Sequence, residues 1–187
     1  VNFFFFFSVF QNYTMKNGLA SNYCYDVLQD SKVYILLATL NGLSRFNGNT
    51  WLNFQQQNKI SKYRLPANWA VDIDEDKFGN IWINTDRGIA MYHHKKDSTI
   101  SFSEPIKGWG KICCTNTNQI LVSSWSGITQ LQQKEHQFKS VYDYTVTARN
   151  SIPFILKDVN GDSWACPEDN PSLIKINSNT KKLSYYK

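Results

Sequence analysis

A short sequence pattern, Asp-x-x-Gly-x-x-Trp, occurs twice in this chain and constrains its fold more strongly than any other feature. It lies at residues 76–82 and returns at residues 158–164. The two occurrences are 82 residues apart, which is two units of 41 residues. Self-similarity at spacings of roughly 20 to 50 residues is typical of repeat architectures. The chain is therefore expected to consist of similar consecutive units.

Two further copies fill the sequence around this pattern. Residues 30–46 align without a gap on residues 76–92, with Thr39 and Thr85 at matching positions 46 residues apart. Residues 119–131 form a weaker copy of the same segment. Together with the copy that begins at Asp158, the chain holds four copies.

The second copy shows the structure of one unit most clearly. Residues 69–74 alternate between apolar and polar positions, which predicts a β-strand. Asp76 and Gly79 then form a turn, and residues 80–85 form the returning strand. A third strand is expected at residues 89–92 and a fourth around residues 100–102. Four short antiparallel strands per repeat are the signature of a propeller blade.

The predicted fold class is all-β, a β-propeller of about four blades with four antiparallel strands each. The blades are expected at residues 17–60, 61–106, 107–145 and 146–187, so that residues 12–187 form one partial propeller. An ordinary β-sandwich also has many short strands. A sandwich is not built from equal consecutive units, so it is not expected to repeat the Asp, Gly and Trp spacing. The propeller is therefore favoured.

Twelve residues are expected to stabilise the repeat rather than to bind a ligand. Trp82 and Trp164, with Leu36 at the matching position of the first copy, should pack between neighbouring blades, and Thr39 and Thr85 should form hydrogen bonds near the ends of their strands. The complete set consists of Asp30, Thr39, Gly42, Asp76, Gly79, Trp82, Thr85, Gly88, Gly127, Asp158, Gly161 and Trp164.

Several copies depart from the pattern. The first has Val33 in place of Gly79, and a β-branched residue is disfavoured at a positive φ, so we expect its turn to differ. The fourth has Pro167 in place of Thr85. The third replaces Asp, Gly and Trp by Thr115, Asn118 and Leu121.

Residues 17–46 and 65–92 closely resemble two-component regulator propeller repeats. The resemblance rests on Gly-Leu-Ala-Ser-Asn at residues 18–22 and on Gly-Asn-Ile-Trp-Ile-Asn-Thr at residues 79–85. In that family, seven-bladed propellers form the periplasmic sensor region of hybrid histidine kinases, and many are thought to sense glycans. The resemblance therefore implies part of a seven-bladed, extracytoplasmic sensor of an inner-membrane homodimer, whose remaining blades and kinase belong to the same longer chain.

The first eleven residues differ from the rest of the chain. Residues 1–10 form an apolar run that includes Phe3 to Phe7 and stops at Gln11. This run is shorter than the roughly 20 residues that span a bilayer. Residues 1–11 are therefore either the remnant of a secretory signal or an edge strand.

Charge and side-chain chemistry exclude several function classes. The net charge is +5, but the lysines and arginines are scattered in no run longer than a pair, so no nucleic-acid partner is expected. Asp72, Asp74 and Asp76 lack the glycine and glutamate of a calcium-binding EF-hand loop. The four cysteines and three histidines have no spacing typical of metal ligands. We expect no metal, no cofactor and no catalytic residue.

The loops that lead into the innermost strands of a propeller surround one mouth of its central channel. Aromatic rings and amide or guanidinium groups in these loops suit an oligosaccharide ligand. The candidate binding residues are Asn22, Tyr23, Asn68, Trp69, Trp109, Arg149 and Asn150. Alternatively, the asparagines cap turns and the tryptophans fill space between blades. At the level of function, the alternatives to a glycan sensor are a propeller lyase or glycosidase and a protein-binding scaffold.

Overall fold

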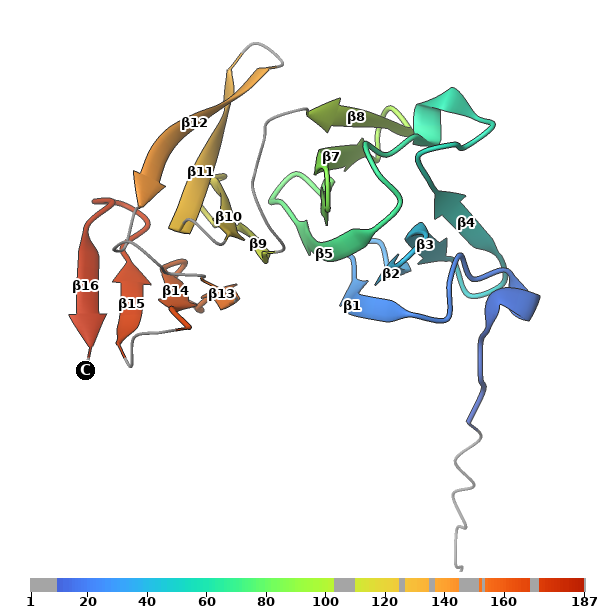
Figure 1. Ribbon diagram of the computed structural model, residues 1–187, viewed down its shortest axis with the longest axis horizontal. Coiled ribbons are helices and arrows are strands. Elements are labelled where there is room, and N and C mark those ends of the chain that lie inside the picture. The colour runs from blue at the N-terminus through green and yellow to red at the C-terminus, as the bar shows by residue number, and fades with distance from the viewer. Residues whose placement is uncertain are drawn as a thin grey trace, which may run out of the picture.

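The computed structural model describes residues 10–102, 110–124, 127–134, 137–144, 152, 154–168 and 172–186. These residues form four separate antiparallel sheets of four strands each, arranged as consecutive blades (Figure 1). The prediction of an all-β propeller with four blades is confirmed. Of the signal remnant or edge strand expected at residues 1–11, residues 1–9 lie outside the described residues, and residues 10 and 11 belong to no strand.

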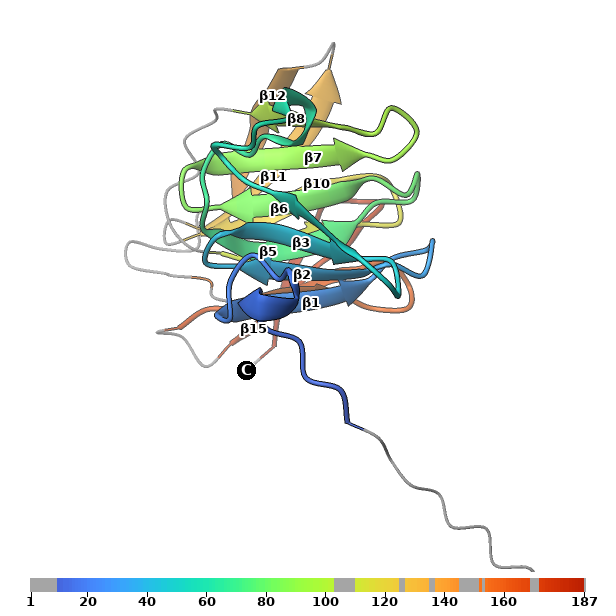
Figure 2. The same ribbon diagram turned by 90° about the vertical axis from the view of Figure 1, so that its right-hand side faces the viewer.

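Within each blade the strands follow the order of the sequence, as Figure 2 shows for blade 2. Blade 1 contains β1 (Cys24–Gln29), β2 (Ile35–Thr39), β3 (Gly42–Phe46) and β4 (Trp51–Phe54). Blade 2 contains β5 (Ala70–Glu75), β6 (Ile81–Thr85), β7 (Gly88–His93) and β8 (Ser98–Phe102). Blade 3 contains β9 (Ile112–Cys114), β10 (Ile120–Ser124), β11 (Gly127–Lys134) and β12 (Gln137–Tyr144). Blade 4 contains β13 (Phe154–Lys157), β14 (Ser163–Cys166), β15 (Leu173–Ile176) and β16 (Leu183–Tyr186).

The remaining regular elements are two 3-10 helices, η1 (Met15–Asn17) and η2 (Ser61–Tyr63). The innermost strands β1, β5, β9 and β13 lie next to one another in that order along the channel wall. Nowhere in the described residues does a helix reach the length and hydrophobicity that crossing a bilayer requires.

The structure gives the Asp-x-x-Gly-x-x-Trp pattern a direct physical reason. In blade 2, Oδ1 of Asp76 accepts hydrogen bonds from the backbone N–H groups of Phe78 and Asn80, both at 2.9 Å. Oδ2 accepts from the indole Nε1 of Trp82 at 3.0 Å. Asp158 makes the equivalent bonds in blade 4, including one of 2.8 Å from Nε1 of Trp164. One carboxylate therefore fixes both the turn and the orientation of the tryptophan six residues later.

The expectation of a different turn in blade 1 is wrong. Val33 N donates to Asp30 O at 2.9 Å, as Gly79 N does to Asp76 O, and Val33 takes up a positive φ of 67°. The carboxylate of Asp30 accepts from the backbone N–H groups of Lys32 and Tyr34, so the turn is held despite the unfavourable residue. Val33 thus carries backbone strain that a glycine would not.

This strain predicts that Val33→Gly stabilises the chain. A residue other than glycine in the left-handed region costs roughly 1 to 3 kcal/mol, and the extra flexibility of glycine when unfolded offsets roughly 0.5 to 1 kcal/mol. Because Val33 is 71% exposed, little packing is lost. The free energy of unfolding in urea should rise by about 1 kcal/mol. Asn118→Gly, at the matching φ of 61° in blade 3, should gain less because asparagine tolerates this region. A destabilised Val33→Gly variant would contradict the assignment of strain.

Blade 1 also lacks the indole that Asp76 binds in blade 2, because Leu36 occupies that position. Here His94, from the turn between β7 and β8, places its Nε2 at 3.0 Å from Oδ2 of Asp30, and both side chains are buried. Burial lowers the pKa of His94, and the charge of Asp30 opposes this shift. The neighbouring blade thus places a buried imidazole against the carboxylate oxygen that the tryptophan indole binds in blades 2 and 4.

The turns between the second and third strands share another hydrogen bond. A hydroxyl at the end of the second strand donates to the carbonyl of a glycine three residues later, which closes the turn. Gly42 is required at its position, because a Cβ there would lie 2.0 Å from the carbonyl oxygen of Phe54. The donor and acceptor pairs are Thr39 and Gly42 at 2.7 Å, Thr85 and Gly88 at 2.6 Å, and Ser124 and Gly127 at 3.1 Å.

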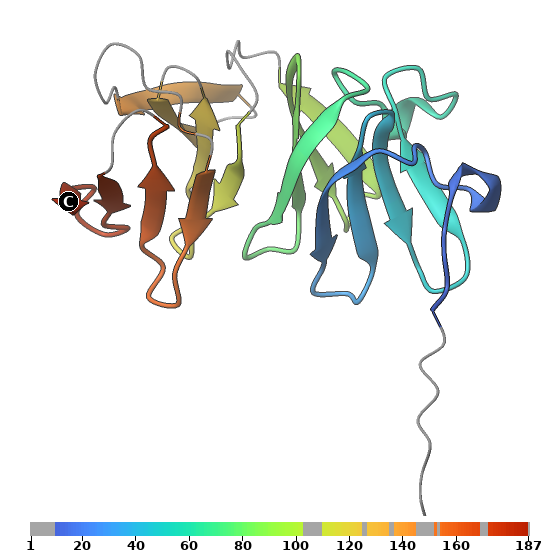
Figure 3. The ribbon, with the colours of Figure 1, turned by 60° about the horizontal axis from the view of Figure 1, so that its bottom comes forward.

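Two sets of turns, between the first and second strands and between the third and fourth, lie at the opposite end of the blades from the loops that lead into the inner strands (Figure 3). We call this end the turn rim. It contains the turn-forming residues Asp30, Asp76, Thr115 and Asp158. The turn acids therefore lie away from the expected ligand mouth.

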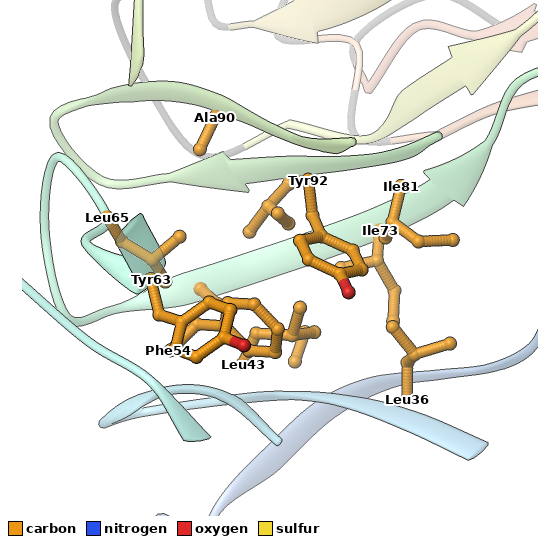
Figure 4. Packing of buried hydrophobic residues seen from close by; sticks show 12 residues of the cluster. Leu36, Leu43, Phe54, Tyr63, Leu65, Ile73, Ile81, Ala90 and Tyr92 are labelled. Carbon is orange, nitrogen blue, oxygen red and sulfur yellow. The ribbon is translucent and has the colours of Figure 1, made fainter. Parts of the chain in front are cut away.

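The core consists of layers between neighbouring blades. Between blades 1 and 2, Leu36 and Leu43 face Ile73, Ile81 and Tyr92 (Figure 4). Between blades 2 and 3, the indole of Trp82 is buried in a cluster with the aliphatic side chains of β9, β10 and β11. A third cluster joins blades 3 and 4. Each blade thus presents one face to the preceding blade and another to the following blade.

On the outward sides of blades 1 and 4 the inner strand is exposed, whereas Tyr13 packs on Phe46 and Trp51 over the outer part of blade 1. Strand pairing places Val27 of blade 1 at the position of Ile73 in blade 2, because they pair with Leu37 and Ile83 respectively. Val27 is 63% exposed and Ile73 only 4%. At the other end, Phe154 and Leu156 of β13 are also largely exposed. We call these the open faces of blade 1 and blade 4.

Candidate functional site

The loops that lead into β1 and β5 contain four of the predicted binding residues. Asn22 and Asn68 use their side-chain oxygens within the fold: Oδ1 of Asn22 accepts from Met15 N at 2.9 Å, and Oδ1 of Asn68 accepts from Gln56 N at 2.8 Å. Both asparagines thus hold backbone segments in place. The predicted residues Trp109, Arg149 and Asn150 lie outside the described residues.

The aromatic side chains at this mouth are more accessible. Tyr23 is 69% exposed and Tyr25 is 44% exposed. The rings of Tyr25 and Trp69 contact each other, with centroids 5.5 Å apart and planes inclined by 44°. Tyr23 directly precedes β1 at the same end of the blades, and we call Tyr23, Tyr25 and Trp69 together the aromatic mouth. Flat rings of this kind pack against the CH face of a sugar.

Tyr25 was not predicted from the sequence. It lies at a register shift between Cys24 and Asp26, where β1 departs from regular pairing with β2. A similar shift occurs between Ala70 and Asp72 in β5. Simple strand alternation does not reveal such bulges, which redirect side chains next to functional sites.

Below the mouth, aspartates connect the inner strands of successive blades. Asp26 accepts a hydrogen bond from the backbone N–H of Ile73 at 3.1 Å. Asp72 and Asp74 accept from Ile112 and Cys114 in the same way, both at 2.6 Å. The side chains of Asp72 and Asp74 thus join β5 to β9. The spacing of Asp72 and Asp74 along one strand did not indicate that they would link two blades in the channel wall.

A cavity of about 320 Å³ lies among β5, β9 and β13 at this level of the channel. Lys111 pairs with Asp72 and lies 3.9 Å from Asp26. Lys157 donates from Nζ to the carbonyl oxygen of Cys114 at 2.7 Å. The cavity is therefore lined by both ammonium and carboxylate groups. No group of three or more side chains suited to hold a metal occurs in the described part of the chain.

Burial controls the acid–base properties of this region. It raises the pKa of Asp72 to about 7, although Lys111 and the N–H of Ile112 favour the ionised form. Burial also raises the pKa of Asp74, and that of the Cys113 thiol to about 12. A thiol with so high a pKa is protonated at neutral pH and is a poor nucleophile.

The raised pKa of Asp72 predicts a pH dependence of stability. Between about pH 4, where an unfolded aspartate loses its proton, and pH 7, the folded chain retains a proton that the unfolded chain has released. The contribution of this group is therefore most favourable below pH 4 and declines as the pH rises to 7. In urea unfolding at pH 5, 6, 7 and 8, the stability of the wild type relative to Asp72→Asn should fall with pH and level off. A constant or rising difference would contradict the prediction.

A second cavity, of about 550 Å³, lies on the open face of blade 1. Its lining includes Asn22, Cys24, Leu37, Phe46 and Trp51. The equivalent surface of the interior blades is filled by the preceding blade. This position makes the cavity a packing surface rather than a preferred ligand site.

No protein-family model and no curated protein sequence matches the chain. Solved structures do match. The extracellular domain of a hybrid two-component system from B. thetaiotaomicron superimposes with a TM-score of 0.64 and 23% sequence identity, covering 88% of this chain and 25% of that one. A second such domain from the same organism gives a TM-score of 0.53 at 15% identity, covering 93% and 31%.

Propeller enzymes are similar as well. Virginiamycin B lyase from Staphylococcus aureus gives a TM-score of 0.64 at 13% identity, covering 86% of this chain and 54% of the lyase. The chain therefore spans between about a quarter and just over half of these structures. The similarities show the propeller fold, which sensors and enzymes share.

Proposed function

We propose that this chain is part of the ligand-sensing extracytoplasmic propeller of a hybrid two-component histidine kinase and that it binds an oligosaccharide at the aromatic mouth. The observation that carries the proposal is the pair of exposed tyrosines, Tyr23 and Tyr25, at the mouth end of blade 1, together with the half-buried Trp69 of blade 2, which contacts Tyr25. The similarity of nearly the whole chain to extracellular domains of two-component systems supports it.

The open faces support a second part of the proposal, that further blades of the same longer chain continue the ring. The open face of blade 4 carries Trp164, which repeats the buried Trp82 and its bond to an aspartate. The open face of blade 1 carries Val27, which repeats the buried Ile73. A blade of the same type on either side would bury these residues, as occurs at the three interior contacts. Seven blades in total would complete the ring.

Signalling would then follow from differential binding. A ligand that binds one state of a dimeric receptor more tightly shifts the equilibrium toward that state. The kinase that responds would lie outside the 187 residues described by this sequence. Location of the propeller on the outer side of the inner membrane would give it access to oligosaccharides.

The proposal is tested by screening the purified 187-residue chain against an oligosaccharide array, followed by chromatography of each bound sugar after incubation. We expect saturable binding and recovery of the intact sugar. Trp69→Ala should weaken binding about tenfold, equivalent to about 1.4 kcal/mol. Tyr186→Ala, which removes a half-exposed ring from blade 4, serves as the matched control and should bind normally. Failure of every sugar to bind would overturn the proposal.

A propeller lyase or glycosidase is the second candidate, favoured by one observation. Asp72 lies in the wall of the channel cavity with a pKa of about 7, which suits proton transfer at neutral pH. However, both oxygens of Asp72 are engaged, one by Lys111 and one by Ile112 N. Release of a smaller or unsaturated product during the chromatography experiment, and its loss in Asp72→Asn, would establish the enzyme instead.

A further inference from the structure

The turn rim, opposite the aromatic mouth, exposes apolar side chains at three of its four inner turns. Val33, Phe78 and Val159 are 71%, 63% and 97% exposed. They lie in the short turns that connect the first two strands of blades 1, 2 and 4, all at the same end of the blades (Figure 3). Turns of this kind ordinarily expose polar residues, glycine or proline. These three side chains therefore form a row of isolated apolar tips.

Two of the turns that carry these tips contact a neighbouring blade. Ser31, in the turn of blade 1, donates from its backbone N and from Oγ to the carboxylate of Glu75 in blade 2, at 2.8 and 2.5 Å. This contact fixes the turn of Val33 beside that of Phe78. On the other side, a Cβ at Gly161 of blade 4 would lie within 2.9 to 3.2 Å of the Asn116 side chain in blade 3. The turn of blade 1 is thus joined to blade 2, and the turn of blade 4 lies against that of blade 3.

The strained backbone of Val33 is a separate observation. At its φ of 67° a glycine would be favourable, yet the chain carries a branched apolar side chain that points into solvent. Because the side chain is 71% exposed, it adds little packing that would offset the strain. A contact with another surface would explain its presence.

The same rim carries unpaired positive charge. Five of its lysines are exposed and have no carboxylate within 4.0 Å among the described residues: Lys32, Lys77, Lys95, Lys96 and Lys182. Among the acids of the rim, Asp97 is ion-paired with Lys62, whereas Asp30 and Asp76 are buried. The exposed charges without a counter-ion that the described residues of the rim present are therefore those of lysines, beside the apolar tips.

We propose that the turn rim docks on an anionic phospholipid bilayer, with Val33, Phe78 and Val159 entering the headgroup region and the lysines contacting lipid phosphates. Lysines near such a surface are each attracted to it, and apolar side chains add burial. A folded protein partner would need a continuous complementary patch or groove, whereas separate protruding tips fit a deformable surface. In this arrangement the aromatic mouth faces away from the membrane and stays open to ligand.

The test is cosedimentation of the 187-residue chain with vesicles of phosphatidylcholine alone or mixed with phosphatidylglycerol. We expect binding only to the mixed vesicles, with affinity falling as salt is raised from 50 to 500 mM. Phe78→Ser should reduce the partition coefficient about tenfold, the effect of losing one buried aromatic side chain. Val33→Gly should also weaken binding although it stabilises the fold, so that lost binding cannot be attributed to unfolding.

Leu40→Ser is the matched control, because Leu40 is 40% exposed in the turn between β2 and β3 at the mouth end. It should bind the mixed vesicles like the wild type. Absence of binding to the mixed vesicles, equal loss with Leu40→Ser, or full binding by Phe78→Ser would overturn the proposal. Cosedimentation with an acidic protein but not with vesicles would overturn it in favour of a protein partner. Oligosaccharide binding at the mouth is measured separately and does not depend on this result.

Discussion

Replacing Trp82 by alanine should lower the free energy of unfolding by about 3 to 5 kcal/mol, the usual cost of removing a large aromatic side chain from a core. Trp82 is only 2% exposed and belongs to the cluster that joins blades 2 and 3. It stacks on Phe102 with a centroid distance of 5.8 Å. The change would leave a cavity between blades and remove the indole partner of Asp76. Urea unfolding followed by circular dichroism measures the effect.

Trp164→Ala is the control that the repeat itself provides. Trp164 occupies the same position in its blade and makes the same bond to an aspartate, but it lies on the open face of blade 4. Its loss should cost clearly less than that of Trp82, because no following blade packs on Trp164 among the described residues. Equal costs for the two variants would contradict the blade arrangement described above. An unchanged unfolding midpoint for Trp82→Ala would contradict the role of Trp82 itself.

Asp76→Ala should be almost as damaging, with a loss of about 3 to 5 kcal/mol, because it leaves several buried donors without an acceptor. The carboxylate accepts from two backbone N–H groups, from Nδ2 of Asn80 and from the Trp82 indole, all between 2.9 and 3.0 Å. The side chain is buried as well. Thermal unfolding should show a marked fall in the melting temperature.

Asp76→Asn separates the two halves of this network. Asparagine keeps one oxygen for the backbone N–H groups of the turn, but its amide would place a donor opposite Asn80 Nδ2 and Trp82 Nε1. We expect Asp76→Asn to be less stable than the wild type but more stable than Asp76→Ala. If Asp76→Asn were as stable as the wild type, the bond to the tryptophan would contribute nothing, and the explanation of the repeat pattern would be wrong.

The fold could be predicted because the blades repeat the same pattern of strand alternation and turn residues. The alternation at residues 69–74 and the turn at Asp76 and Gly79 correspond to β5, β6 and the turn between them. The prediction failed at Val33, because residue preference alone suggested a different turn. The hydrogen bonds of the Asp30 carboxylate outweighed that preference. Sequence pattern also could not show that His94 of the next blade would approach Asp30.

The candidate site was harder to predict because it depends on contacts between blades. The loops that lead into the inner strands predicted Tyr23 and Trp69. Tyr25 is placed by a β-bulge, which residue preferences do not predict. The pairing of Asp72 with Lys111 joins residues 39 positions apart, across a blade boundary. Neither the register nor the contact follows from a single repeat. Within the aromatic mouth, Tyr23 and Trp69 were expected from the sequence, whereas only the structure reveals Tyr25.

The most direct test of the ligand site is a titration followed by the indole N–H signals in NMR spectra of the ¹⁵N-labelled chain. Trp69 reports on the aromatic mouth, Trp82 on the core between blades, and Trp51 on the cavity at the open face of blade 1. With an oligosaccharide that binds on the array, the Trp69 signal should shift saturably while those of Trp82 and Trp51 stay in place. A saturable shift of Trp51 with Trp69 unchanged would contradict the mouth as the sensing site.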